Sequence, residues 1–176
     1  MSAKDSTFRL SKPVRKSLLA AHVITSVGWL GITLADLVLA ITVNTTSQPA
    51  TQHSIYWVLR IIGNVVLLPI SLSALVTGVL VSLGTPWGLL RYRWVLVKFG
   101  LTVVTVLLTW FSLTPGLRES AAIVAHTPFD QMARVDGSDL MYAACVSTTV
   151  YTGNVLLSIF KPWGRTGWGR RVLAQR

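Results

Sequence analysis

Two ionisable side chains stand in an apolar stretch near the start of the chain, residues 20–39, which read AAHVITSVGWLGITLADLVL. His22 offers an imidazole that can relay protons or bind a metal, and Asp36 offers a carboxylate at membrane depth. Fourteen residues separate them and Trp29 lies midway, so all three share one helical face. Along a helix axis this spacing is about 21 Å. We therefore expect two separate polar layers, not one catalytic pair.

The composition indicates that these residues lie in lipid. Of 176 residues, 52% are hydrophobic and only 12% are charged, whereas soluble domains carry about 25% charged residues. The net charge of +10 does not indicate nucleic acid, because the basic residues cluster at the edges of apolar runs. The expected partner is a bilayer with an anionic inner leaflet. The single cysteine, Cys145, excludes an intrachain disulfide and a Cys/His zinc pattern.

Four segments reach the roughly 20 apolar residues that a transmembrane helix needs. The expected spans are residues 17–43, 56–83, 92–113 and 139–160. The expected connections are residues 44–55, 84–91 and 114–138, with the third span ending at Thr114-Pro115-Gly116. Basic tails are expected at 1–16 and 161–176. The sequence thus predicts an all-α fold, a polytopic membrane four-helix bundle with its transmembrane domain over 17–160.

The basic residues also predict the orientation. Thirteen of the 16 Lys and Arg residues fall in the two tails, the second connection and the start of the third span. Only Arg60, Arg118 and Arg134 fall on the opposite side. Both termini should therefore be cytoplasmic. The first apolar run is longer than the core of a cleavable signal peptide, so it is interpreted as a retained span. We expect a multi-pass protein of a bacterial plasma membrane.

Each expected span has one face of polar or small residues at helical spacing. These faces comprise positions 22, 26, 29, 33, 36 and 40; 60, 64, 67, 71, 74 and 78; 98, 102, 105, 109 and 112; and 147, 151, 154 and 158. Small and hydroxylated residues let membrane helices pack closely. Packing alone explains the charged members of these faces less well.

Toward the outer side, Asp36 is expected at the same depth as Arg60, with Asn64 one turn below Arg60. The first two spans are joined by a short connection and should be antiparallel neighbours. We therefore predict an ion pair between Asp36 and Arg60, with Asn64 beside it. It would serve either as a structural bridge or as a polar site in the outer leaflet.

Toward the cytoplasmic side, His22, Lys98 and Asn154 are expected in one layer, together with Thr77 and Gly78. Two interpretations of this layer remain open. His22 is either a buried histidine bonded to a hydroxyl or a ligand for a cofactor or metal. Lys98 either reaches back to the interface or joins the same site.

Three segments carry a resemblance to known proteins: HVITSVGWLG, TGVLVSLGTPWGLLRYRWVLVKFGLT and SIFKPWG. They resemble an uncharacterised family of small four-helix integral membrane proteins of actinobacteria, which implies the fold and location but no activity. His22 followed by Trp29 is also similar to the first helix of copper-resistance protein D and of bacterial membrane protoporphyrinogen oxidase. Trp94 followed by Lys98 is similar to a later helix of the oxidase. That similarity implies haem b or copper at His22, although only one histidine lies within a span.

The sequence has no catalytic signature such as a nucleophile elbow, a phosphate loop or a His-Glu-x-x-His helix. It favours a protein without catalytic activity. The first hypothesis is a membrane protein that binds a small ligand or a membrane partner. The second is a redox protein with haem or copper on His22. The third is a small transporter or proton-coupled channel, which with four helices would act as a homo-oligomer.

Overall fold

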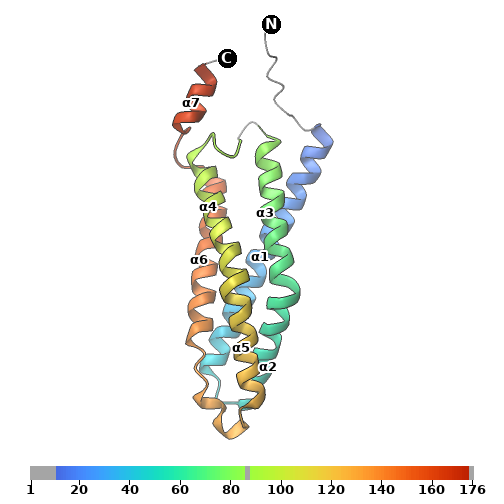
Figure 1. Ribbon diagram of the computed structural model, residues 1–176, viewed down its shortest axis with the longest axis vertical. Coiled ribbons are helices and arrows are strands. Elements are labelled where there is room, and N and C mark those ends of the chain that lie inside the picture. The colour runs from blue at the N-terminus through green and yellow to red at the C-terminus, as the bar shows by residue number, and fades with distance from the viewer. Residues whose placement is uncertain (1–10, 86–87, 175–176) are drawn as a thin grey trace.

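The computed structural model describes residues 11–85 and 88–174, and its main feature is four long helices packed side by side (Figure 1). The first is α1 (Lys12–Thr45) and the fourth is α6 (Ser138–Phe160). The second consists of α2 (Pro49–Ile61), the π-helical turn η1 (Ile62–Leu67) and α3 (Leu68–Leu83). The third consists of α4 (Arg93–Leu108), the π-helical turn η2 (Thr109–Leu113) and α5 (Thr114–His126). A 3-10 helix, η3 (Phe129–Arg134), precedes α6, and a short helix, α7 (Gly167–Ala174), follows it.

All four long helices are apolar enough to cross a membrane. Large apolar side chains point away from the bundle, as Ile24 and Phe111 do with 71% and 76% of their surface exposed. In water such exposure would be costly, whereas in lipid it is the expected outer surface. The predicted all-α four-helix bundle is confirmed, and the protein is an integral, multi-pass membrane protein.

The two ends of the bundle differ in what lies there (Figure 1). The described chain starts and finishes at one end, where α3 also connects to α4, while the α1–α2 and α5–α6 connections lie at the other. We call residues 12–29, 71–85, 88–108 and 151–174 the termini half, and residues 30–70 and 109–150 the hairpin half. In the termini half, α1 packs on α3 and α6, and α4 also packs on α3 and α6. In the hairpin half, α2 packs on α5.

The helices extend beyond the expected spans, so several expected loops are wrong. The connection expected at 44–55 is only residues 46–48. The third helix does not end at Thr114-Pro115-Gly116 but continues to His126, and η3 occupies part of the remaining expected loop. The expected tail 1–16 is helical from Lys12, and the tail 161–176 contains α7. Lys4, Arg9 and Arg176 of the expected tails lie outside the described residues.

The helices continue through two prolines because each proline follows a π-helical turn. Pro69 comes two residues after η1 ends, and Pro115 comes two residues after η2 ends. A proline ring clashes with the carbonyl four residues earlier and lacks an N–H donor. Each proline therefore lies in the first turn of the helix that follows the π turn. In a first turn the missing donor is not needed.

Each π turn also changes which face of its helix points into the bundle. One extra residue rotates the following face by about 100°. In the second helix, Ser71 and Ala74 are buried as expected, but before η1 the buried residue is Leu59, and within the turn it is Gly63. Arg60 and Asn64, expected on the inward face, are displaced from it. In the third helix, Ser112 is likewise exposed.

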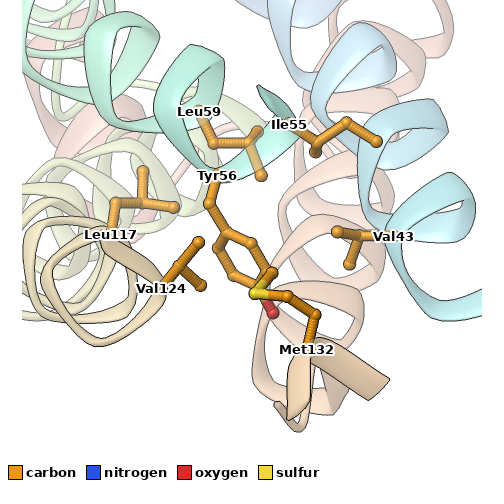
Figure 2. Close-up of a cluster of buried hydrophobic side chains, with 7 residues drawn as sticks. All are labelled: Val43, Ile55, Tyr56, Leu59, Leu117, Val124 and Met132. Atoms are coloured by element: carbon orange, nitrogen blue, oxygen red, sulfur yellow. The ribbon is translucent and has the colours of Figure 1, made fainter. Parts of the chain in front are cut away.

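The hairpin half is closed by a cluster of large apolar side chains (Figure 2). The cluster consists of Val43, Ile55, Tyr56, Leu59, Leu117, Val124 and Met132. The Tyr56 ring lies among the others, with Met132 of η3 against it (Figure 2). This end of the bundle is therefore closed by a packed apolar core.

Backbone hydrogen bonds hold the start of the C-terminal segment against the α3–α4 connection. The Thr166 amide donates to the Arg91 carbonyl at 2.9 Å, and the Arg93 amide donates to the Gly164 carbonyl at 3.3 Å. Gly169 lies so close that an added Cβ would be 2.4 Å from the Arg91 carbonyl oxygen. Only glycine fits at this contact between α7 and the α3–α4 connection.

Candidate functional site

The termini half contains a cavity of about 390 Å³ between α1, α3, α4 and α6. Its lining is mostly aliphatic and aromatic. The polar or charged side chains in the lining are His22, Ser26, Ser82, Thr85, Lys98, Thr102, Tyr151, Asn154 and Ser158. The structure thus brings His22, Lys98 and Asn154 together around one space, with Gly78 beside His22.

His22 is held on α1 by a contact with α3. Its Nδ1 lies 3.1 Å from the Thr77 hydroxyl, which donates its one proton to the Ser73 carbonyl at 2.6 Å. His22 must therefore donate from Nδ1, and Nε2 is the acceptor of the neutral ring. A Cβ on Gly78 would lie 3.0 Å from the imidazole Cε1. The glycine lets α1 approach α3 with the ring between them.

Lys98 is held across the cavity by α6. Its Nζ donates to the Ser158 hydroxyl at 2.5 Å, and that hydroxyl donates to the Asn154 carbonyl at 2.9 Å. Ser158 is a neutral partner, and no carboxylate is found among the described lining residues. Lys98 and His22 interact electrostatically, so two basic side chains from different helices face the same space.

Two further polar atoms of the lining have no hydrogen-bond partner within the described part of the chain. They are the Ser82 hydroxyl and Oδ1 of Asn154, and both atoms are buried. Buried polar atoms are normally paired, because leaving one unpaired costs about 1–3 kcal/mol. Both residues line the cavity, but the two atoms themselves are covered by surrounding protein atoms.

The predicted ion pair between Asp36 and Arg60 is wrong. Oδ1 of Asp36 is buried and has no hydrogen-bond partner among the described residues. The Arg60 guanidinium carbon instead lies 5.0 Å from the centre of the Trp57 ring. Asn64 accepts a hydrogen bond from Nε of Arg118, at 2.5 Å. The π turn η1 explains the error, because it places Leu59, and not Arg60, on the face toward Asp36.

Asp36 lines a void of only about 30 Å³ in the hairpin half. Trp29 and Tyr151 line both this void and the large cavity. Their ring centroids are 4.4 Å apart, with an interplanar angle of 46°. This aromatic pair therefore separates the two spaces, and its side chains form the wall that they share.

The residues near His22 do not assemble a metal centre. No group of three His, Cys, Asp or Glu side chains that could hold a metal occurs in residues 11–85 and 88–174. His53 packs against Phe129 in the hairpin half, at 5.8 Å between ring centroids, and His126 ends α5. A haem iron would find His22 as its one imidazole ligand in the cavity. The donor set fits neither a bis-histidine haem nor a copper ion held by protein ligands alone.

Sequence reasoning missed three features of the site. Ser82 lies one turn beyond Gly78 on the same helical face, so continuing that period by four residues would have found it. Arg118 was expected in a loop, which hid its contact with Asn64. The shared wall of Trp29 and Tyr151 depends on how α1 packs on α6, although both residues were expected on inward faces.

No protein-family model, no curated protein and no solved structure matches this chain. The resemblance to the actinobacterial family and the weaker similarity to the two haem- or copper-related proteins therefore stay predictions. The fold and the cavity define the class as a multi-pass, all-α membrane protein with an internal cavity.

Proposed function

We propose that this protein binds a small, mainly apolar ligand within the membrane, in the cavity of the termini half. One observation carries the proposal: a cavity of about 390 Å³ whose apolar wall holds a few converging polar groups. Ligand sites commonly have volumes of about 300–1,000 Å³ and this kind of lining. The function requires no catalytic step, in keeping with the absence of a catalytic signature in the sequence.

Filling the cavity tests this proposal. Thr102 is half-buried and lines the cavity, so Thr102→Phe should occupy the space of a ligand. Val104 of the same helix is 55% exposed on the outer surface, so Val104→Phe is the matched control. We expect Thr102→Phe to abolish saturable binding of dodecanol to the purified protein in nanodiscs, and Val104→Phe to retain it. Equal binding by both variants and the wild type would mean that the cavity is not a ligand site.

A second candidate function is proton-coupled transport, and the Asp36 void supports it. Asp36 has an unpaired buried oxygen beside the aromatic wall that borders the ligand cavity. Carboxylates at membrane depth are common elements of proton relays in transporters. Proton binding at Asp36 would then change the charge next to Trp29 and Tyr151. Four helices are few for a carrier, so this candidate implies a homo-oligomer.

Uptake by proteoliposomes under an imposed pH gradient separates the two candidates. We expect Asp36→Asn to leave dodecanol binding unchanged, because Asp36 does not line the large cavity. If the protein is a transporter, the same variant should lose gradient-driven uptake of a labelled probe that the wild type transports. Uptake that is equal for wild type, Asp36→Asn and empty liposomes would leave binding alone as the function.

We also propose that the termini half faces the cytoplasm of a bacterial plasma membrane, against an anionic leaflet. Trp163 and Trp168 are exposed at this end, as are Arg170 and Arg171. Indole and guanidinium groups favour the lipid headgroup region, and cytoplasmic segments carry an excess of Lys and Arg. A periplasm-dependent reporter fused after Arg176 should therefore be inactive. An active fusion would reverse the orientation.

A further inference from the structure

The charges around the cavity indicate what kind of ligand it accepts. Lys98 on α4 and His22 on α1 are basic, and both line the cavity. Lys98 has three N–H donors, and Ser158 is its one hydrogen-bond partner among the described residues. A charged side chain at membrane depth is costly unless it is paired. Among the described residues, the cavity wall supplies no carboxylate to pair with it.

The donor groups of the wall suit an oxygen-rich group. Ser82 lines the cavity and its hydroxyl is a donor. The unpartnered atom of Asn154 is the amide oxygen Oδ1, which only accepts, so it is not a partner for an anionic head. The charged donor to an oxygen acceptor is the Lys98 ammonium. Nε2 of His22 becomes a further donor when the ring is protonated.

The rest of the wall suits a hydrocarbon chain. Val79, Val95, Phe99, Val155 and Ile159 are among its apolar members. At about 30 Å³ for each water-sized group, the cavity of about 390 Å³ has room for about a dozen such groups. A linear chain of about that many carbons matches the space.

We propose that the ligand is a single-chain anionic amphiphile whose carboxylate or phosphate head lies between Lys98 and His22. The inference rests on the proposed ligand-binding function and adds the charge and the shape of the ligand. The head pairs with the Lys98 ammonium and accepts hydrogen bonds from the wall. The chain occupies the apolar part of the cavity, toward the wall formed by Trp29 and Tyr151.

Three probes of equal chain length test the charge requirement: dodecanoate, dodecyl phosphate and dodecanol. For each probe, binding to Thr102→Phe in nanodiscs is subtracted from binding to the wild type. The subtraction removes the signal from probe that partitions into the lipid. We expect saturable binding of at least one anionic probe to be about tenfold or more tighter than that of dodecanol, since a charge-assisted contact replaces a neutral one. Comparison of the two anionic probes shows whether a carboxylate or a phosphate is preferred.

Substitution at Lys98 tests where the charge is recognised. Lys98→Met should lower affinity for the anionic probe by about tenfold or more and leave dodecanol binding unchanged. Lys98→Arg should retain the preference for the anionic probe, which distinguishes charge recognition from a loss of folding. The retained dodecanol binding of Lys98→Met is a second control for folding.

The outcomes separate this inference from the proposed function. If dodecanol binds as tightly as both anionic probes, and all three are lost in Thr102→Phe, the cavity binds apolar ligands but the charge requirement is wrong. An unchanged preference in Lys98→Met would also overturn it. If no probe distinguishes wild type from Thr102→Phe, the proposed function itself fails.

Discussion

The two halves of the bundle are built from the same four long helices but differ in how far side chains fill the centre. In the hairpin half, seven large side chains close the centre, and the void at Asp36 measures about 30 Å³. In the termini half, a wall of mostly apolar residues with interspersed glycine, serine and threonine surrounds a cavity of about 390 Å³. Space in a packed interior is filled wherever large residues face each other. The large residues of the termini half therefore do not meet across its centre as those of the hairpin half do.

The difference also extends to charge. In the termini half, the basic group of Lys98 has a neutral partner on another helix and faces an open space. In the hairpin half, Asp36 has an oxygen without a partner and borders a space of about one water molecule. The first arrangement can accept a ligand with a charged head. The second can accept little more than a water molecule or a proton.

Truncating one aromatic residue in each half should give the largest difference in the free energy of unfolding. Tyr56 is 3% exposed within the hairpin cluster, whereas Phe99 is half-buried on the cavity wall. Tyr56→Ala should approach the loss of about 3–5 kcal/mol that aromatic-to-Ala changes cause in packed cores. Phe99→Ala should cost less than half as much, because its side chain already borders empty space. Thermal unfolding in detergent, with both variants in parallel, measures the contrast, and equal losses would contradict the difference in packing.

Double-mutant cycles should show a smaller difference between the two halves: substitutions at one pair of residues should be coupled, and substitutions at the other pair should not. Lys98→Met and Ser158→Ala remove two partners in contact, so their effects on the free energy of unfolding should be coupled by about 0.5 kcal/mol or more. Asp36→Asn and Arg60→Gln should be additive within about 0.5 kcal/mol, because Arg60 lies over Trp57. Coupling between Asp36 and Arg60 would restore the ion pair that the sequence predicted.

The sequence predicted the helices better than it predicted their faces. Four apolar runs predicted four helices because lipid imposes both length and composition. The inward faces of α1 and α6 also follow from an unbroken period of 3.6, as buried Trp29 and Asn154 illustrate. In the two middle helices, η1 and η2 each insert a residue and rotate the face. Reasoning from a constant period therefore placed Arg60 and Ser112 inward, and the structure places neither there.

The site was predictable in its residues but not in its shape. Helical spacing and depth along each span brought His22, Lys98 and Asn154 into one layer without any knowledge of packing. The cavity depends on the distance between helices and on side-chain rotamers, which a periodic pattern does not encode. The contact between Gly78 and His22 sets part of that distance, yet a glycine in a membrane helix by itself indicates only close packing.

The smallest expected effect is a pH dependence at the connection before α6, outside the membrane-spanning helices. The Asp136 carboxylate accepts hydrogen bonds from the Ser138 amide at 2.9 Å and from its hydroxyl at 3.0 Å. These bonds lower the pKa of Asp136 below its ordinary value of 3.8. A lowered folded pKa means that the stabilisation is present above pH 3.8 and is lost as the pH falls through the folded pKa.

A carboxyl-carbon NMR titration of Asp136 measures this pKa directly. Ser138→Ala keeps the amide donor and removes the hydroxyl donor, so it should move the pKa of Asp136 part of the way back toward 3.8. Hydrogen exchange of the first turn of α6 should increase in acid for the wild type, whereas Asp136→Asn should show no such dependence. The dodecanol affinity of the cavity should be the same in all three proteins, since the contact between Asp136 and Ser138 belongs to the hairpin half. A change in that affinity would mean that the two halves are coupled and not independent.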